Sequence, residues 1–198
     1  RDVLGSRGLG DVYKRQIINR SEQSRTFALL NIKTNLKSIT MKKIVLIGAS
    51  GFVGSAILNE ALNRGIKVTA VVRNPENVKI SNPDVTIVKA DVSDADKVAE
   101  LCKGADAVIS AYNPGWTNPD IYHLTLKVYP QILAGAKKAG IKRLLIVGGA
   151  GTLFVAPGLR VVDSGAIPAE IMDGVKSLGE FYLNTVSYTH LRAHETLR

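Results

Sequence analysis

The sequence predicts an α/β protein built on a doubly wound parallel sheet with helices on both faces. Three observations predict it. From residue 41 onward, short apolar runs alternate with segments of helical periodicity. The first run, KKIVLIG, is apolar in the way expected of a strand buried on both faces, and a glycine-rich turn follows it directly. Strands separated by helices form β-α-β units, whose right-handed crossovers make the sheet parallel.

Five strands are expected in this body of the chain. Each is a short apolar run bounded by charged residues, glycine or proline. They cover residues 42–48, 66–73, 85–91, 105–112 and 141–149.

Three helical segments lie between these strands. The first begins at Phe52, repeats apolar residues at helical spacing and stops at Gly65. The second is expected to begin with Ser93 as its cap. The third covers about residues 120–139 and contains Pro130, which is expected to kink or break it.

The composition of the chain fits one globular domain. Its 198 residues are 45% hydrophobic and 22% charged. No apolar run approaches the roughly 20 residues that a membrane span needs, so no membrane segment is expected. The single cysteine, Cys102, cannot form an internal disulfide, which fits a reducing, cytoplasmic location.

The net charge of +9 does not by itself indicate a nucleic-acid partner. Residues 41–184 hold sixteen Lys/Arg and thirteen Asp/Glu, so this part carries only +3. Its lysines are scattered among acids without interleaved aromatic residues, which is not the pattern of a nucleic-acid-binding face. We therefore expect no nucleic-acid partner.

The two ends of the chain are related at the level of DNA. The related segments are SRGLGDVYKRQ (6–16) and VSYTHLRAHET (186–196). One choice of codons for the first has a reverse complement that, read in a shifted frame, encodes the second. Such an inverted repeat resembles the adaptor pair of a transposase-based sequencing library, and segments of this kind are excluded from fold reasoning.

This interpretation divides the chain into three parts. Residues 1–40 are expected to be non-native or disordered, from an adaptor and upstream read-through, with Met41 as the natural start. Residues 41–184 are expected to be the folded domain, incomplete at its C-terminus, and residues 185–198 an adaptor-derived tail. Without the two ends, His123 is the only histidine, and no metal site is expected.

The motif GASGFVG lies where the first strand turns into the first helix. Its glycines suit a tight turn, close approach of a pyrophosphate to the backbone, and close packing of the helix on the strand. The helix N-terminus then offers unpaired N–H groups and a positive dipole end to the phosphates. Residues 41–184 are therefore expected to form an NAD(P)-binding Rossmann-like domain. The predicted phosphate loop consists of Gly48, Ala49, Ser50, Gly51, Phe52, Val53 and Gly54.

Arg73, at the end of the second predicted strand, favours NADP(H) over NAD(H). A carboxylate at this position would accept a hydrogen bond from a ribose 2′-hydroxyl, whereas an arginine suits a 2′-phosphate. No carboxylate follows this strand before Glu76. NAD(H) stays open as the alternative, because an arginine here can also face solvent or stack on the adenine.

Several segments carry a family resemblance: KKIVLIGASGFVG, VTAVVRNPE, KADVSD, GADAVISAYNPG and AGIKRLLIVGGAG, in this order. They resemble the atypical short-chain dehydrogenase/reductases of the NAD-dependent epimerase/dehydratase superfamily, and more narrowly its NAD(P)H-binding NADH-flavin reductase group. The resemblance covers about residues 41–184 and implies cofactor contacts after the third, fourth and fifth strands. Asp91 can also be read as a turn residue that starts a helix. The implied residues are Asp91, Val92, Ser110, Ala111, Tyr112, Gly148 and Gly149.

The Tyr-x-x-x-Lys pair and the serine of classical short-chain dehydrogenases are absent. No catalytic residue is therefore assigned, and the expected acceptor is a flavin, quinone or similar conjugated molecule that takes its proton from water. Trp116 and Tyr122 would either stack on this acceptor or only pin their loop. Phe154 is a further substrate candidate.

Two alternatives stay open. The missing pair also suits NmrA-like proteins, which sense NAD(P) and bind a protein partner without turnover. Nucleotide-sugar epimerase or dehydratase activity is the other, and the missing pair and the small size of the chain weaken it.

Overall fold

The structure, a computed structural model, describes residues 42–188. Contacts divide the chain into two units, Arg1–Thr40 and Met41–Arg198, and every described residue belongs to the second. The predictions made for residues 1–41 and for the chain beyond Tyr188 lie outside the described residues.

A five-stranded parallel sheet forms the centre of the described unit. Its strand order is β3-β2-β1-β4-β5, and every neighbouring pair is parallel. The doubly wound, Rossmann-like fold class and all five predicted strands are confirmed. Because the chain winds outward on both sides of the β1–β4 pair, the carboxyl ends of these two strands flank the crevice where such sheets bind ligands. The strands are β1 Lys43–Ile47, β2 Lys67–Val72, β3 Val85–Lys89, β4 Ala107–Ser110 and β5 Leu144–Ile146.

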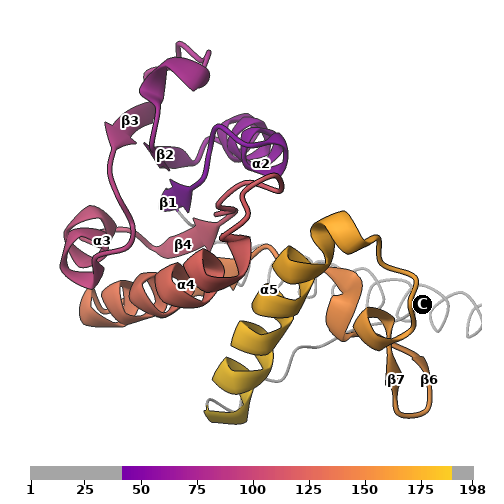
Figure 1. Cartoon of the computed structure of the whole chain (residues 1–198). Helices are drawn as coiled ribbons and strands as arrows, with labels where there is room; N and C mark the ends of the chain where they lie inside the picture. Colours follow the sequence, from indigo (N-terminus) through magenta and orange to yellow (C-terminus); the bar gives the residue numbers. More distant parts are fainter. Residues whose placement is uncertain (1–41, 189–198) are drawn as a thin grey trace, which may run out of the picture. The chain divides into compact units, whose positions relative to one another are not determined.

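Helices cover both faces of the sheet (Figure 1). Helix α2 (Phe52–Asn63) lies on one face, where Ile44 and Leu46 of β1 are buried in the core. The other face, with Val45 and Ile47, is covered by α3 (Ala95–Cys102) and α4 (Ile121–Lys138). Alternate side chains of β1 therefore enter two hydrophobic cores, and full burial of each contributes about 1.5–3 kcal/mol to stability.

Two details of the predicted helices are wrong. Helix α3 is capped by Asp94, whose carboxylate accepts a hydrogen bond from the N–H of Asp96 at 2.8 Å, and not by Ser93. Ser93 lies one residue earlier, in a turn where its N–H donates to the carboxylate of Asp91. Of the kink or break expected at Pro130, the break is wrong, because α4 continues through this residue, which is on the exposed side while the inner side stays packed on the core.

After β5 the chain forms a small hairpin and a long helix that the sequence reading did not predict. Strands β6 (Phe154–Ala156) and β7 (Leu159–Arg160) pair antiparallel, and Gly158 turns between them with φ +78°. Helix α5 (Ala169–Tyr188) packs along α4 and extends into the predicted tail (Figure 1). Three short 3-10 turns complete the unit: η1 Pro75–Asn77, η2 Ala150–Thr152 and η3 Val161–Asp163.

Candidate functional site

Two glycines in the turn from β1 to α2 cannot be replaced by a larger residue unless the backbone around them moves. Gly48 has φ +81°, and a Cβ on it would lie 2.6 Å from the backbone oxygen of Ala111. A Cβ on Gly54 would lie 2.0 Å from the backbone oxygen of Gly48. Both distances are far inside van der Waals contact, so the loop packs backbone against backbone at these two points.

Gly51, the remaining glycine of the motif, is exposed and lies at the start of α2. A Cβ on it would only touch the oxygen of Gly48 at 3.5 Å, so its outer side is open to a ligand. No side chain caps α2, and its first turn holds no acid. Within residues 42–188, no partner is found for the N–H groups of Phe52, Val53 and Gly54. Unpaired N–H groups and a positive helix end form a cradle that fits a pyrophosphate.

The other loop residues frame this cradle from two sides. Ala49 is buried under α2, whereas Ser50 is exposed. The side chains of Phe52 and Val53 point outward, and that of Phe52 is 95% exposed. Phe52 therefore contributes nothing to the core, although it belongs to the apolar repeat from which the helix was predicted.

Hydrogen bonds align the carboxyl ends of the strands beside the glycine loop. The N–H of Gly48 donates to Val71 at 2.9 Å, and the N–H of Ala111 donates to Ile47 at 2.9 Å. The residues predicted to contact cofactor after β2, β3 and β4 thus lie at the same edge of the sheet as the glycine loop that follows β1. The edge is the one at which open α/β sheets bind ligands.

The pKa values of Asp91 and Tyr112 at this edge depend on nearby charges, which include that of Arg73. The N–H and hydroxyl of Ser93 hold the pKa of Asp91 below its usual value, and the positive charges of Lys127 and Arg73 lower it further. Burial raises the pKa of Tyr112, while Arg73 acts in the opposite direction and Asp91 adds to the rise. The structure thus brings an arginine, a carboxylate and a neutral phenol together at the edge.

The structure bears on both interpretations of Asp91. Its carboxylate accepts the N–H of Ser93 at 2.9 Å, which is the geometry of a turn residue before a helix. It is also exposed at the sheet edge, where a ligand could reach it. The side chain of Val92, in contrast, is buried in the core, so only its backbone is available to a cofactor.

A buried tyrosine that the sequence reading missed lies under the end of β4. The hydroxyl of Tyr129 donates to the backbone oxygen of Tyr112 at 2.8 Å. Burial raises the pKa of Tyr129 to about 12, against a smaller lowering by its hydrogen bond with Ser110. Ser110 is fully buried, so it acts within the protein and not on its surface. Periodicity would have placed Tyr129 on the inner face of α4 beside Val128, but it does not reveal a backbone acceptor.

Gly148 and Gly149 follow β5 and are exposed. A Cβ on either would meet no atom within 4 Å, and neither has a positive φ. The protein itself therefore does not require glycine at these positions, which leaves room for a ligand beside β5.

The aromatic residues predicted to line the acceptor site contact α5. A Cβ on Gly174 of α5 would lie 2.7 Å from the ring of Trp116, which is half exposed. The hydroxyl of Tyr122 donates to the carboxylate of Glu180 at 2.5 Å, and this bond raises the pKa of the phenol. Both contacts agree with the reading in which these aromatics pin their loop.

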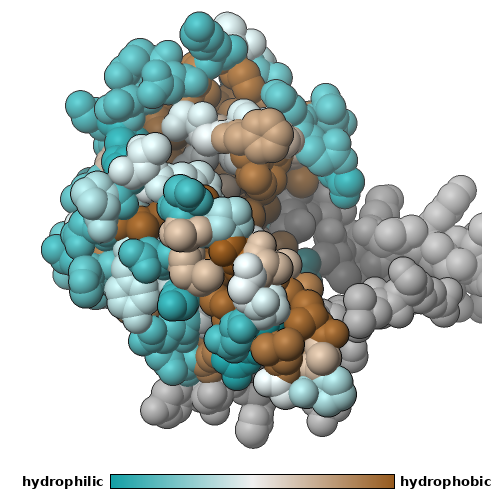
Figure 2. Space-filling model, turned by 45° about the vertical axis from the view of Figure 1, so that its right-hand side comes forward, coloured by the Kyte–Doolittle hydropathy of each residue, from teal (hydrophilic) through white to brown (hydrophobic). Residues whose placement is uncertain are grey.

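Phe154 lies on the β6–β7 hairpin and is 64% exposed. The guanidinium carbon of Arg160 lies 5.9 Å from the centre of its ring, within cation–π range. Figure 2 shows a group of hydrophobic side chains at the lower right of the view. The large exposed apolar residues in and beside the hairpin are Leu153, Phe154, Val155 and Leu159.

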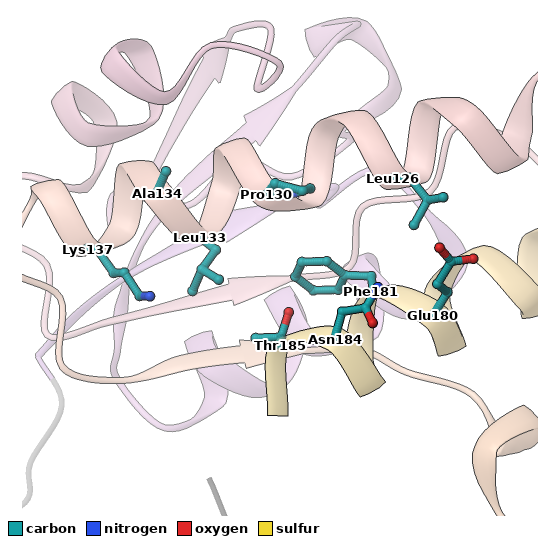
Figure 3. Close-up of a pocket in the computed structure, with 9 residues that line it drawn as sticks. All are labelled: Leu126, Pro130, Leu133, Ala134, Lys137, Glu180, Phe181, Asn184 and Thr185. Carbon is teal, nitrogen blue, oxygen red and sulfur yellow. The ribbon is translucent and has the colours of Figure 1, made fainter. Parts of the chain in front are cut away.

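A groove of about 520 Å³ runs between α4 and α5 (Figure 3). All of its lining residues come from these two helices, and none follows a strand of the sheet. It is therefore separate from the glycine loop. Its lining residues are Leu126, Pro130, Leu133, Ala134, Lys137, Glu180, Phe181, Asn184 and Thr185.

The described residues contain neither a metal site nor a membrane-spanning helix. Among residues 42–188, no three or more His, Cys, Asp or Glu side chains are grouped as a metal ion would need. No helix in this part of the chain combines the length and apolar character that crossing a bilayer requires.

The chain matches a family of known proteins and resembles several of them. A family model described as NAD(P)H-binding matches residues 48–191. The uncharacterized protein YwnB of Bacillus subtilis is 40% identical over 140 residues, which cover 70% of this chain and 62% of that protein.

Two solved structures are also similar. A candidate epimerase from Bacteroides thetaiotaomicron is 65% identical with a TM-score of 0.69, over 74% of this chain and 65% of that one. A candidate NADH-flavin reductase from Streptococcus pneumoniae is 32% identical with a TM-score of 0.55, over 71% of this chain and 63% of that one. The chain spans less than two thirds of the length of each of these three relatives.

Proposed function

The chain belongs to the NAD(P)H-binding family, and we propose that it is an atypical short-chain reductase that uses NADPH to reduce a flavin, quinone or similar conjugated acceptor. One observation carries the choice of acceptor. The sheet edge offers a dinucleotide cradle but no tyrosine–lysine pair at the Tyr-x-x-x-Lys spacing among residues 42–188. The hydroxyl of Tyr129 is buried and donates to the backbone of Tyr112, and burial raises the pKa of both tyrosines. A phenol that relays a proton to a carbonyl substrate needs a lowered pKa, so an acceptor protonated by water suits this edge better.

Different residues of the site would bind different parts of the dinucleotide. The N–H groups at the start of α2 would bind the pyrophosphate, and Gly51 would let it approach the backbone. Ala111 and Tyr112 would lie near the ribose, with Ser110 buried behind them, and Gly148 and Gly149 would border the nicotinamide. Bound NADPH would supply a hydride to the acceptor, which takes a proton from water and leaves NADP⁺.

We propose NADPH as the preferred dinucleotide because of Arg73. This residue is exposed directly after β2, and the next carboxylate along the chain is Glu76 in η1. A guanidinium at this strand end can pair with a 2′-phosphate, for which NADH has no counterpart. Titration of the protein with both reduced dinucleotides tests this, and tighter binding of NADH would overturn it.

Turnover is tested by following the loss of NADPH absorbance with a panel of flavins and quinones. We expect oxidation with at least one acceptor, in support of which the similar Streptococcus pneumoniae protein is a candidate NADH-flavin reductase. Binding of NADPH without oxidation by any acceptor would favour the NmrA-like sensor instead.

The epimerase alternative has support of its own, because a candidate epimerase is 65% identical to this chain. It needs a group that withdraws a proton or hydride from a bound sugar, and no tyrosine–lysine pair at the Tyr-x-x-x-Lys spacing occurs among residues 42–188. Incubation with nucleotide sugars distinguishes the two activities, since the reductase should leave them unchanged.

The cytoplasmic location stays a prediction. Its support is the lone Cys102, which is buried and whose pKa burial raises to about 11, so it is an unreactive core thiol. Cell fractionation tests it.

A further inference from the structure

We propose that Tyr129 is a positioning residue of the dinucleotide site and acts through the backbone of Tyr112. The inference rests on the proposed dinucleotide-binding function, but it concerns a residue that would touch neither cofactor nor acceptor. Tyr129 is 1% exposed and lies on the inner face of α4.

Tyr129 holds Tyr112 at two points. Its hydroxyl donates to the backbone oxygen of Tyr112 at 2.8 Å. Its ring meets the ring of Tyr112 edge to face, with centroids 5.7 Å apart and planes at 78°. Both the backbone and the side chain of Tyr112 are therefore set by one buried residue.

The position of Tyr112 is transmitted to the glycine loop through Ala111. The N–H of Ala111 donates to Ile47, the last residue of β1, and its oxygen lies against Gly48 so closely that no Cβ fits between them. A shift of Tyr112 would move this backbone segment relative to Gly48. The segment 110–112 is thus one wall of the predicted site, and Tyr129 supports it from behind.

Helix α5 supports Tyr129 from the other side. The ring of Phe181 lies 5.1 Å from the ring of Tyr129, with an angle of 30° between their planes, and is itself buried. The packing thus runs from α5 through two aromatic pairs, Phe181–Tyr129 and Tyr129–Tyr112, to the end of β4. A tyrosine hydroxyl is protonated at neutral pH, and burial raises the pKa of this one further, so it remains a hydrogen-bond donor.

Packing alone does not require this hydroxyl, since a phenylalanine would fill nearly the same volume. Its acceptor distinguishes it from other buried hydroxyls on the same helix. Thr125 is also buried on α4, but its hydroxyl donates to Ile121 of that helix at 2.7 Å. Thr125→Val therefore removes a buried hydroxyl whose hydrogen bond stays within α4 and does not reach the segment 110–112, and it is the matched control for Tyr129→Phe.

The experiment compares the full chain with its Tyr129→Phe and Thr125→Val variants. Hydrogen–deuterium exchange of the peptide that contains residues 110–112 is measured without dinucleotide, and NADPH affinity is measured by fluorescence titration. We expect Tyr129→Phe to exchange faster in this peptide and to bind NADPH about fivefold to tenfold more weakly, as for one buried carbonyl left without its donor. Thr125→Val should change neither quantity.

Four outcomes would overturn the inference. Wild-type exchange of the peptide in Tyr129→Phe would mean that the hydroxyl does not hold the segment. Equal loss of affinity in Thr125→Val would mean that any lost hydroxyl on α4 has this effect. Wild-type NADPH affinity in Tyr129→Phe would overturn the positioning role alone, whereas a wild-type chain that binds neither NADPH nor NADH would overturn the proposed function together with it.

Discussion

Gly54 offers the sharpest test of the glycine loop. In Gly54→Ala the new Cβ would lie 2.0 Å from the oxygen of Gly48 and 2.9 Å from its carbonyl carbon. A carbon and a carbonyl oxygen normally approach to about 3.3 Å, so α2 and the loop must separate by roughly 1 Å. Overpacking of this kind costs about 1–3 kcal/mol. Alanine recovers up to about 1 kcal/mol through its higher helix propensity. We expect a net loss of about 1–2 kcal/mol in the free energy of unfolding.

The same movement should weaken dinucleotide binding more than it weakens the fold. A displacement of about 1 Å in a binding constellation can cost on the order of a hundredfold, so we expect NADPH affinity to fall about tenfold to hundredfold. Urea unfolding measures the first quantity and fluorescence titration the second. Gly149→Ala is the stability control, because its Cβ meets no atom within 4 Å and its backbone is extended, so its stability should change by less than about 0.5 kcal/mol. Wild-type stability together with wild-type NADPH affinity in Gly54→Ala would refute the reasoning. The loop would then accommodate the Cβ without any loss of folding or binding free energy.

Three further predictions follow from contacts elsewhere in the structure. Arg73→Ala should lower NADPH affinity about tenfold while leaving NADH affinity nearly unchanged; an equal fall for both, in parallel titrations, would show that the guanidinium does not read a 2′-phosphate. Asp94→Ala should lower the free energy of unfolding, measured in urea, by about 1 kcal/mol, because it removes the cap of α3. A larger loss in Ser93→Ala would instead identify Ser93 as the cap, as the sequence first predicted. Two N–H groups at the start of β1 donate to Asp106 and hold its pKa below the usual 3.8. This stabilisation is present above the usual pKa and is lost as the pH falls through the lowered one. Asp106→Asn should therefore lose less stability than the wild type between about pH 5 and pH 2; equal losses in urea unfolding at each pH would contradict it.

The sheet could be predicted from the sequence because its strands are buried on both faces. Such strands appear as short, nearly continuous apolar runs, and the structure has a strand within each predicted range. Helix α5 was not predicted, since its buried positions include Gly174, Ser177 and Phe181. Gly174 must be small because the rings and methyl groups of Trp116 and Ile121 press against it. A helix whose inner face is partly glycine and serine carries little apolar periodicity.

The candidate site divides in the same way. The glycine loop was recognisable because glycine is needed wherever backbone must meet backbone, and this need is visible in residue type and spacing. Tyr129 was not recognisable, because its partner is the backbone oxygen of Tyr112, and every residue has such an oxygen whatever its side chain. Asp91 lies between these cases: its residue type suits both a turn and a ligand, and its hydrogen bond to Ser93 accounts for the turn.

Three backbone oxygens define the geometry of the proposed dinucleotide site. The oxygen of Ala111 closes on Gly48, that of Gly48 closes on Gly54, and that of Tyr112 accepts from Tyr129. Each contact ties α2, β1, β4 or α4 to a neighbour, so the cradle is a consequence of how the sheet and its helices pack. A cofactor that is bound mainly through such backbone groups tolerates change in most side chains around it. We expect acceptor choice to depend instead on exposed side chains such as Phe154, which the packing leaves free to vary. One glycine spacing can therefore identify the class of cofactor across proteins that reduce different acceptors.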